Sequence, residues 1–380
     1  MRILYCIPAL WNSGGMERVL TQKVNWLAAH TAHEITILTT ERVPAGSPEH
    51  YFPLSEKVKA VSLDIDFNAD YSKPLPAKYF AHMSRMRAYE RALRGYIGEH
   101  RIDLCISLCG KEIAFLRRLP CRTMVEMHFA KDQRRQLLMA NHRGWFWSLA
   151  GRVRTWQLVR AVRPLERLVV LTESDKKAWE EAGCRNVTVI PNPCSLEGLK
   201  IPMKPKKKTI LAVGRLHEQK GFDMLLQAWQ AIEKEYPERT LRIVGEGPRR
   251  AELEAQAGTL GLKHVSLAGR TENVADEYSE ASLFVLSSRY EGLPLALIEA
   301  MWSGVPCVAF DCPQGPAELL DQERGWLVPV NDVEKLTEQI EYVISHPDEA
   351  QERARKAQQF AHATYSEQTI MPEWKRIIEN

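Results

Sequence analysis

Two glutamates, Glu291 and Glu299, stand with seven residues between them inside a strand–loop–helix pattern. The run Leu283–Leu286 predicts a short buried strand. Pro294 suits the first turn of a helix, because its fixed φ is helical and its missing N–H would have no partner there. An ionised carboxylate is purely an acceptor and can take two hydroxyl donors at once. The pair predicts a site for a hydroxyl-rich ligand, although two glutamates at this spacing also occur on ordinary solvated helices.

The loop before this helix suits an anion. Gly292 follows Glu291, and the backbone N–H groups of Leu293, Leu295 and Ala296 stand where the helix begins. The first N–H groups of a helix have no acceptor within it and carry the positive end of its dipole. A phosphate is a ligand that such an end favours.

A second candidate site follows a strand predicted at 209–214. Arg215 and Lys220 flank the turn between this strand and a helix predicted at 222–235, with Gly214 just before them. A rigid guanidinium fork and a mobile ammonium on one loop can hold two linked phosphates. The alternative is a pair of unrelated surface cations.

The first half of the chain opens with a similar unit. Residues 1–10 predict a buried strand, a helix is expected to run to about His30, and 34–39 predicts the next strand. Gly14-Gly15 at the turn lets the backbone approach an anion above the strand ends, or only makes a tight turn. Glu17 belongs either to that site or to the ordinary charges of a first helical turn. The absence of G-x-G-x-x-G argues against a dinucleotide.

His128 stands at the carboxyl end of a strand predicted at 122–127. A lone histidine is usually structural or solvent-exposed. However, ligands of open α/β sheets bind at the carboxyl ends of the strands. His128 is therefore a candidate catalytic residue.

The segment 131–167 is basic and aromatic, and it includes Arg134, Arg135, Trp145 and Trp147. Tryptophans beside arginines on an amphipathic helix suit an anionic membrane surface. The same pattern fits a half-buried helix whose tryptophans are core residues. Nucleic acid is disfavoured because no recognisable binding module accompanies the pattern.

Composition indicates an ordinary globular protein. The 380 residues are 45% hydrophobic and 26% charged, and the formal net charge of +3 implies no particular partner. The eight cysteines are scattered without a C-x-x-C pair, which argues against a zinc site or a disulfide framework. No run of 18 apolar residues and no leader segment is evident, so we expect a cytoplasmic protein whose membrane contact, if any, is peripheral.

Several motifs together resemble a known family. The E-x7-E pair, the G-R-L-x-x-x-K-G loop at 214–221 and the G-G-x-E-R turn at 14–18 are similar to those of retaining glycosyltransferases of family 4, also called group 1. The resemblance spans essentially the whole chain and implies the GT-B fold, an α/β architecture of two doubly wound, Rossmann-like domains facing a cleft. It implies an acceptor-binding domain at 1–195, a linker at 196–208 and a donor-binding domain at 209–364. A terminal helix at 365–380 is then expected to pack back on the first domain.

The resemblance also implies roles. Arg215 and Lys220 would stabilise the departing nucleoside diphosphate, Glu291 would bind hydroxyls of the donor sugar, and Glu299 would bind the ribose. Gly269 and Arg270, after a strand predicted at 265–267, would lie near the nucleobase. Gly15 would lie beneath the donor phosphates, and His128 would meet the donor sugar or the acceptor. The residues expected at the acceptor site or the membrane surface are Glu17, Arg134, Arg135, Trp145 and Trp147. Gly214, Gly292, Leu293 and Leu295 complete the expected donor site.

The expected reaction moves a hexose or N-acetylhexosamine from a UDP-sugar to a glycan or a polyprenyl- or lipid-linked acceptor, in surface polysaccharide biosynthesis. No cofactor and no metal are expected. The sequence Asp64-Ile65-Asp66 superficially matches the D-x-D metal motif of the other main glycosyltransferase fold, but it lies away from the other motifs. Two alternatives stay open: a UDP-sugar epimerase of the same fold, and a non-catalytic nucleotide- or glycan-binding subunit of a polysaccharide-assembly complex.

Overall fold

The computed structural model describes residues 1–67, 75–132, 145–199, 207–271, 273–321 and 323–380. The chain forms two compact units: Met1–Pro191 together with Met371–Asn380, and Asn192–Ile370. The second unit begins earlier than the domain boundary expected from the sequence, which placed a linker at 196–208. The reason is packing: the Cys194 N–H donates to the Tyr365 carbonyl at 2.7 Å, and both residues are buried. Of the expected linker, residues 200–206 lie outside the described residues.

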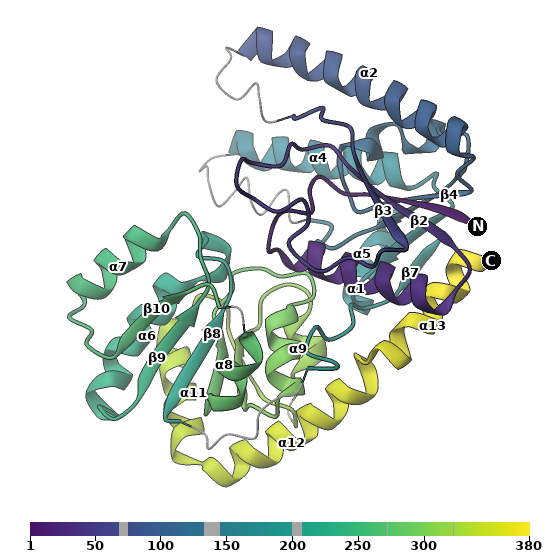
Figure 1. Cartoon of the computed structure of the whole chain (residues 1–380). Helices are drawn as coiled ribbons and strands as arrows, with labels where there is room; N and C mark the ends of the chain where they lie inside the picture. Colours follow the sequence, from purple (N-terminus) through teal and green to yellow (C-terminus); the bar gives the residue numbers. More distant parts are fainter. Residues whose placement is uncertain (68–74, 133–144, 200–206, 272, 322) are drawn as a thin grey trace. The chain divides into compact units, whose positions relative to one another are not determined.

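The first unit is built on a parallel sheet with the strand order β3-β2-β1-β4-β5-β6-β7. Figure 1 shows the long helices α2 and α4 on one side of this sheet and α1 and α13 on the other. The strands are β1 (Arg2–Cys6), β2 (Glu34–Thr39), β3 (Val58–Ser62), β4 (Leu104–Ser107), β5 (Arg122–Glu126), β6 (Arg167–Val170) and β7 (Val187–Val189). The helices are α1 (Gly15–His30), α2 (Leu75–His100), η1 (Lys111–Ala114), η2 (Leu116–Arg118), α4 (Trp145–Val162), α5 (Glu173–Glu181) and α13 (Glu367–Glu379), the last belonging to this unit from Met371 onward.

Alternation along the strands explains this layering, because successive side chains point to opposite faces of a sheet. Leu4 and Cys6 of β1 pack against Tyr89 and Leu93 of α2 in one buried cluster. Tyr5, between them, faces Lys23 of α1. Both faces are covered, so the strands read as continuous apolar runs in the sequence.

The second unit repeats the plan with the order β10-β9-β8-β11-β12-β13, and each strand pair is parallel. Its strands are β8 (Thr209–Val213), β9 (Thr240–Val244), β10 (Val265–Gly269), β11 (Leu283–Leu286), β12 (Cys307–Phe310) and β13 (Trp326–Val328). Its helices are η3 (Glu218–Lys220), α6 (Phe222–Glu235), α7 (Arg250–Thr259), α8 (Val274–Glu280), α9 (Leu295–Trp302), α10 (Pro316–Leu319), α11 (Val333–Ser345) and α12 (Pro347–Thr364).

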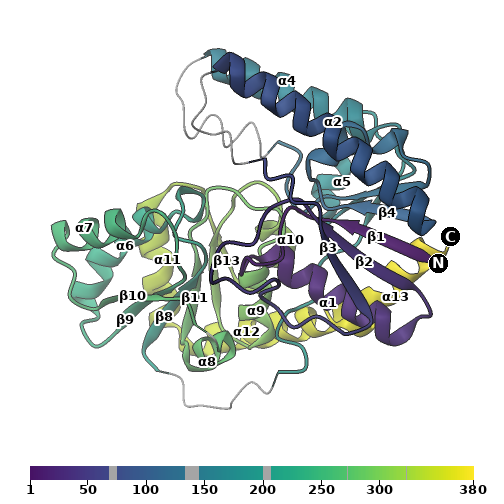
Figure 2. The same ribbon diagram turned by 45° about the horizontal axis from the view of Figure 1, so that its top comes forward.

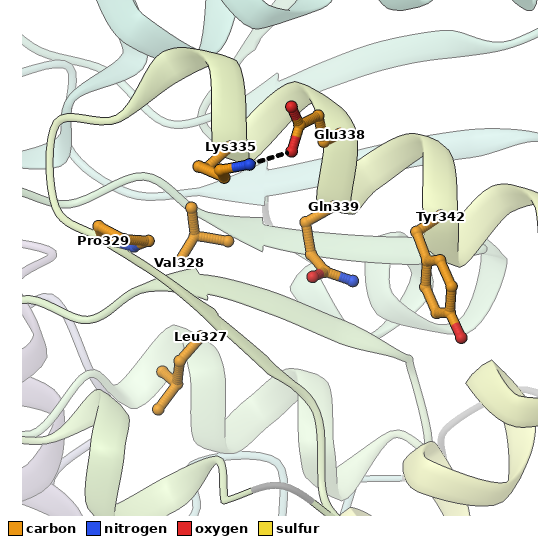
Figure 3. Close-up of a pocket in the computed structure, with 7 residues that line it drawn as sticks. All are labelled: Leu327, Val328, Pro329, Lys335, Glu338, Gln339 and Tyr342. Atoms are coloured by element: carbon orange, nitrogen blue, oxygen red, sulfur yellow. Dashed lines mark hydrogen bonds and ion pairs between the residues drawn. The ribbon is translucent and has the colours of Figure 1, made fainter.

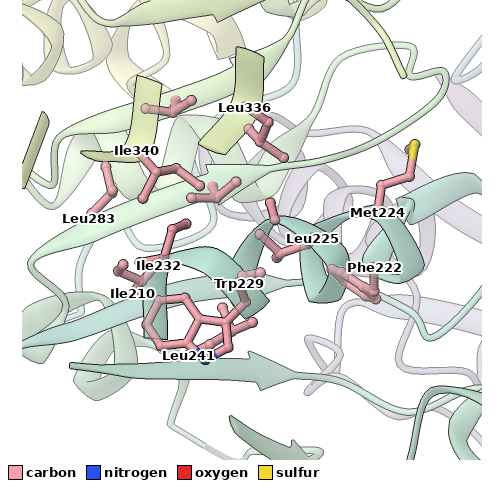
Figure 4. Close-up of a cluster of buried hydrophobic side chains, with 14 of the residues drawn as sticks. Ile210, Phe222, Met224, Leu225, Trp229, Ile232, Leu241, Leu283, Leu336 and Ile340 are labelled. Atoms are coloured by element: carbon pink, nitrogen blue, oxygen red, sulfur yellow. The ribbon is translucent and has the colours of Figure 1, made fainter. Parts of the chain in front are cut away.

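A single apolar cluster joins α6 and α11 to this second sheet. Trp229 of α6 is completely buried and lies beside Ile210 and Leu241 in Figure 4, and Ile340 of α11 belongs to the same cluster. This packing holds the strand ends of the second unit in place. In the described ranges no helix is long and apolar enough to cross a membrane.

In each sheet the strand that comes first in the sequence has later strands on both of its sides. β1 lies between β2 and β4, and β8 lies between β9 and β11. The connections that follow β8 and β11 therefore leave toward opposite faces of the sheet at the carboxyl ends of the two strands. Open α/β sheets bind ligands at such a topological switch point. Figure 2 shows β8 and β11 of the second sheet from a second direction.

Candidate functional site

The loops that follow β8 and β11 are hydrogen-bonded into one structure. The Arg289 N–H donates to the Gln219 carbonyl at 2.8 Å, and the Gln219 side chain donates to the Tyr290 carbonyl at 2.9 Å. The Ser287 hydroxyl donates to the Lys220 carbonyl at 2.9 Å. These bonds hold the loop of the predicted cations against the loop that carries Glu291.

Arg289 strengthens this junction. Its guanidinium donates to the Glu218 carbonyl at 2.7 Å and forms a two-pronged ion pair with Asp223, at 2.9 and 2.6 Å. Such pairs fix geometry because both groups are planar. Neither Arg289 nor Asp223 was predicted as a site residue. The two are 66 residues apart, so no local sequence pattern indicates that they form an ion pair.

The two loops bring Lys220 and Glu291 into contact. Lys220 Nζ lies 2.7 Å from Glu291 Oε1, and the Ser288 hydroxyl donates to the same oxygen at 2.6 Å. The Glu291 side chain is 7% exposed and that of Lys220 is 19% exposed. The predicted cation and the predicted sugar-binding carboxylate therefore belong to one partly buried site.

Two glycines allow this close approach. A Cβ on Gly214 would lie 3.1 Å from Cε of Lys220, so the lysine stem passes directly over the end of β8. Gly221 has a φ of +63°, and a Cβ there would lie only 2.0 Å from the Ser287 carbonyl oxygen. Gly221 is therefore required by both conformation and space.

Arg215 lies at the exposed side of the same loop. Burial lowers the pKa of His217, and the charge of Arg215 lowers it further. Burial also raises the pKa of Tyr290 to about 12, with smaller effects from Glu218 and Glu291. The Arg215 charge has a lowering effect on the pKa of Tyr290 as well, so Arg215 lies near both loops.

Glu299 lies inside α9 and is 6% exposed. Its Oε2 accepts a hydrogen bond from the Tyr278 hydroxyl at 2.8 Å, and its Oε1 accepts one from the Ser195 hydroxyl. Glu299 was predicted from the sequence, but its two partners were not. Ser195 lies 104 residues earlier in the chain, and Tyr278 belongs to α8. The carboxylate is held in place before any ligand is considered.

The start of α9 faces a tightly packed neighbouring loop. Pro294 is the N-cap residue, and Leu295 is the first residue of the helix, one position later than expected. Gly315 has a φ of +91°, and a Cβ there would lie 2.6 Å from both the Gly292 carbonyl oxygen and Pro294 Cδ. The backbone at Gly315 thus packs directly against the turn Gly292-Leu293, in which Leu293 is 7% exposed.

Cys312 lies in the same neighbouring loop and is 2% exposed. Burial raises the pKa of its thiol, and the nearby charge of Glu291 raises it further. Cys312 is therefore a protonated neighbour of the Lys220–Glu291 pair and not a nucleophile.

Gly269 and Arg270 end β10. Gly269 has a φ of +77°, and its carbonyl accepts a hydrogen bond from the Gly245 N–H at 2.8 Å. Arg270 is exposed. The structure places both at the carboxyl edge of the second sheet, on the opposite side of β8 from Glu291.

The glycine turn of the first unit leads into α1. Gly14 is the N-cap of α1 and Gly15 is an exposed first residue. A Cβ on Gly14 would lie 2.3 Å from Oε2 of Glu17, so the closely approached position is Gly14. Glu17 itself is 8% exposed and folds back over the turn, which excludes the reading of it as an ordinary exposed first-turn charge.

His128 lies two residues beyond β5, and its side chain is 5% exposed. Its Nε2 is 3.1 Å from Glu126 Oε1, and Glu126 also forms a buried ion pair with Lys23. Burial alone would raise the pKa of Glu126, but Lys23 and His128 lower it to about 2. Glu126 and Lys23 were not among the residues predicted from the sequence, although a carboxylate at the end of an apolar strand is a signal that could have indicated Glu126.

The basic, aromatic segment is described only in part. Arg134 and Arg135 lie outside the described residues. Trp145, at the start of α4, is 77% exposed, whereas Trp147 is half-buried. The two tryptophans therefore do not share one environment.

A pocket on the second unit lies away from these loops, between β13 and α11 (Figure 3). Lys335 and Glu338 within it are ion-paired with each other at 2.7 Å. Its lining contains no residue predicted from the motifs: Leu327, Val328, Pro329, Lys335, Glu338, Gln339 and Tyr342. Among the described residues there is also no group of three or more His, Cys, Asp or Glu side chains placed to hold a metal ion.

Sequence comparisons identify the family. The family model for group 1 glycosyl transferases matches residues 199–360, and that for glycosyltransferase family 4 matches residues 13–197. The two matches follow one another and together include every strand of both sheets except β1 (Arg2–Cys6). This chain belongs to the family 4, or group 1, glycosyltransferases. The expected family is confirmed.

Individual relatives agree with this assignment. The chain is 29% identical to an uncharacterised glycosyltransferase of Haemophilus influenzae, covering 99% of both chains. It is also 29% identical to an α-1,4-N-acetyl-D-galactosaminyltransferase of Campylobacter jejuni, over 100% of this chain and 98% of the relative; that enzyme's name gives a GalNAc-containing, undecaprenol-diphosphate-linked glycan as its acceptor.

The fold matches solved glycosyltransferase structures. A variant of S. aureus TarM, in complex with Fondaparinux, α-GlcNAc-glycerol and UDP, superimposes with a TM-score of 0.74 at 16% identity, covering 100% of both chains. The predicted fold class, GT-B with two Rossmann-like α/β domains, is confirmed. The protein is a glycosyltransferase.

Proposed function

We propose that this glycosyltransferase is a retaining, metal-independent enzyme that moves a hexose or N-acetylhexosamine from a UDP-sugar to a glycan or lipid-linked acceptor in polysaccharide biosynthesis. The observation that carries the proposal is the joined pair of loops after β8 and β11, which places Lys220 beside Glu291 at 2.7 Å. A cation and a fixed carboxylate in one site match the two ends of a nucleotide-sugar, a diphosphate and a ring of hydroxyls.

Stabilisation of the leaving diphosphate comes from three positive groups. Lys220 has a long, partly exposed side chain, Arg215 is exposed on the same loop, and the first N–H groups of α9 lie beyond Glu291. Charge develops on the leaving oxygen as the bond to the sugar breaks, and fixed positive groups lower that barrier. These groups serve the purpose that a divalent metal serves elsewhere, which supports metal independence.

Glu291 is suited to bind donor-sugar hydroxyls. Its Oε1 is occupied by Lys220 and Ser288, which leaves lone pairs on the carboxylate for a sugar hydroxyl. Glu299 is suited to the ribose, because Tyr278 and Ser195 fix its orientation. Arg270, exposed beside the buried Gly269 at the carboxyl edge of the sheet, is suited to contact the nucleobase.

Relatives support the choice of donor and acceptor. The name of the Campylobacter relative gives an α-1,4-N-acetylgalactosaminyltransferase acting on an undecaprenol-diphosphate-linked glycan, and the TarM structure holds UDP and α-GlcNAc-glycerol. UDP-N-acetylhexosamines are therefore the first donors to test. An α-linked product from an α-linked donor is retention, and the leaving phosphate would accept the proton of the incoming hydroxyl on the same face.

A surface of α4 suits the membrane in which lipid-linked acceptors reside. Trp145, Leu149, Val153 and Trp156 recur at intervals of four, four and three residues, and they are 77, 50, 45 and 57% exposed. This spacing puts them on one face of the helix. The sequence of α4 contains arginines and no acidic residue. We assign this face, the α4 stripe, to an anionic bilayer.

The test is thermal stability of the whole chain against UDP, GDP, ADP, NAD and the UDP-linked forms of glucose, galactose, GlcNAc and GalNAc, each with and without EDTA. A ligand at 100 times its Kd adds about 2.7 kcal/mol. A shift with UDP compounds that survives EDTA is expected. The best donor is then incubated with a lipid-linked glycan, and the anomeric proton of the product is read by NMR. An inverted product, or dependence on a divalent ion, would overturn the corresponding part of the proposal.

A further inference from the structure

A buried cluster of charged side chains lies behind His128 in the first unit. Lys23 of α1 is 1% exposed, Glu126 of β5 is 0% exposed, and the His128 side chain is 5% exposed. Burying ionised groups is costly unless they are paired. Stabilising the fold does not require charges here, since apolar side chains of similar size often serve as well. The cluster therefore calls for a functional explanation.

Its geometry is organised around one carboxylate. Glu126 is the last residue of β5 and His128 lies two residues beyond it, and their side chains meet at the carboxyl end of the strand. Oε2 of Glu126 contacts Lys23 Nζ, and Oε1 lies 3.1 Å from His128 Nε2. The second contact has the distance of an ion pair but not the alignment of a linear hydrogen bond. Each oxygen thus has its own neighbour.

The ammonium of Lys23 is held from its other side by aromatic rings. Lys23 Nζ lies 3.7 Å from the ring centre of Trp374 in α13 and 5.6 Å from that of Tyr5 in β1. A cation over an aromatic face is attracted by the ring quadrupole. The buried ammonium of Lys23 in α1 is therefore surrounded by side chains from β1 and α13 as well as by Glu126.

We propose that Lys23 and Glu126 are positioning residues that hold the His128 imidazole in one orientation at the carboxyl end of β5. Glu126 fixes the Nε2 side of the ring, and Lys23 fixes Glu126. The Nδ1 side is then the side of the ring that does not face Glu126. The inference rests on the proposed function, because it gives His128 the role of contacting substrate.

The orientation is tested directly by NMR of the full chain carrying ¹⁵N,¹³C-histidine. His128 is assigned by the signal that disappears in His128→Ala. In Glu126→Gln the His128 ring signals are expected to shift or broaden, because the fixed anion is lost. The matched control is Glu112→Gln: Glu112 is another buried carboxylate of this unit, but its partners are Tyr89, Ser107 and the Gly110 N–H.

The coupling to catalysis is tested by a double-mutant cycle on turnover, measured as UDP release from the best donor of the thermal panel. His128→Ala and Glu126→Gln are each expected to lower kcat by roughly 10- to 100-fold, the scale for losing a group that orients a reacting one. In the double variant the losses should not multiply, because Glu126 acts through His128. Lys23→Met/Glu126→Gln, which leaves no unpaired charge, is expected to stay folded and to remain slow.

Unchanged His128 signals in Glu126→Gln would overturn the positioning role. Multiplied losses in Glu126→Gln/His128→Ala would overturn it too, since Glu126 would then act independently. Full activity in Lys23→Met/Glu126→Gln would show a purely structural pair. A further outcome separates the two roles of His128. If turnover is normal in His128→Ala, but the His128 ring signals of the otherwise wild-type chain change in Glu126→Gln, the catalytic role of His128 fails and the positioning contact stands.

Discussion

Nζ of Lys220 lies 2.7 Å from Oε1 of Glu291, although 71 residues separate them in the sequence. The contact depends on hydrogen bonds that join the two loops. The Arg289 N–H donates to the Gln219 carbonyl, and the Gln219 side chain donates to the Tyr290 carbonyl. A donor diphosphate would draw Lys220 toward itself, while Ser288 continues to hold Glu291.

Replacing Lys220 by Ala is expected to lower kcat by roughly 10²–10³, because one stabiliser of the leaving group is lost. Steady-state kinetics with a UDP-sugar measures the effect. Lys335→Ala is the control: Lys335 is an exposed lysine paired with Glu338, and its loss should leave kcat unchanged. Normal turnover in Lys220→Ala would remove the diphosphate assignment.

Gly214→Ala is expected to weaken donor binding with little loss of folding stability. The added methyl group would lie 3.1 Å from the Lys220 stem, so the lysine must shift. Gly258→Ala in α7 is the matched control, because nothing lies within 4 Å of the new Cβ and alanine favours a helix by about 0.5–1 kcal/mol. UDP titration calorimetry and urea unfolding of both variants separate the two effects. Equal UDP affinity in Gly214→Ala and wild type would contradict the expectation.

Glu299→Ala is expected to weaken UDP binding through the ribose and also to destabilise the second unit. The Tyr278 hydroxyl would lose its carboxylate acceptor but keep the Ala296 carbonyl at 3.1 Å, so the expected cost is that of one hydrogen bond, about 0.5–1.5 kcal/mol. Tyr278→Phe separates the two roles, since it removes the hydroxyl and keeps the carboxylate. We expect Tyr278→Phe to affect stability more than UDP affinity; the reverse ranking by thermal shift and titration would reject the ribose role of Glu299.

The Lys23–Glu126 pair should make the first unit sensitive to acid. The pKa of Glu126 is lowered from 4.5 to about 2 in the folded protein, so its contribution to stability is present above about pH 4.5 and is lost as the pH falls toward 2. Lys23→Met/Glu126→Gln lacks this titration. The difference in unfolding free energy between wild type and this variant should therefore shrink from pH 5 to pH 2. A difference that stays constant over this range would contradict the lowered pKa.

The α4 stripe is expected to bind anionic vesicles. Trp145→Ala/Trp156→Ala should reduce sedimentation with phosphatidylglycerol-containing vesicles and leave UDP affinity unchanged, because both side chains are more than half exposed. Trp147→Ala, at a half-buried position, should instead lower the melting temperature. Undiminished vesicle binding by the double variant would reject the assignment of the stripe.

Local patterns in the sequence were enough to place most elements of the fold. The strands at Glu34–Thr39 and Leu283–Leu286 and the helix Phe222–Glu235 match their expected bounds, because apolar runs and helix signals act over a few residues. The motifs also indicated which loops carry Arg215, Lys220, Glu291 and Glu299. Helix α12 was not anticipated; it buries a face made of alanines, which gives little contrast in an apolar pattern.

Tertiary structure decided which groups share a site. The contacts of Glu299 with Ser195 and Tyr278, of Lys220 with Glu291, and of Glu126 with Lys23 join residues far apart in the chain. Each contact exists because a parallel sheet brings distant strand ends to one edge, and a single sequence carries no record of that proximity. The chain by itself therefore determined the chemistry available, and the packing of its strands determined which side chains can act together.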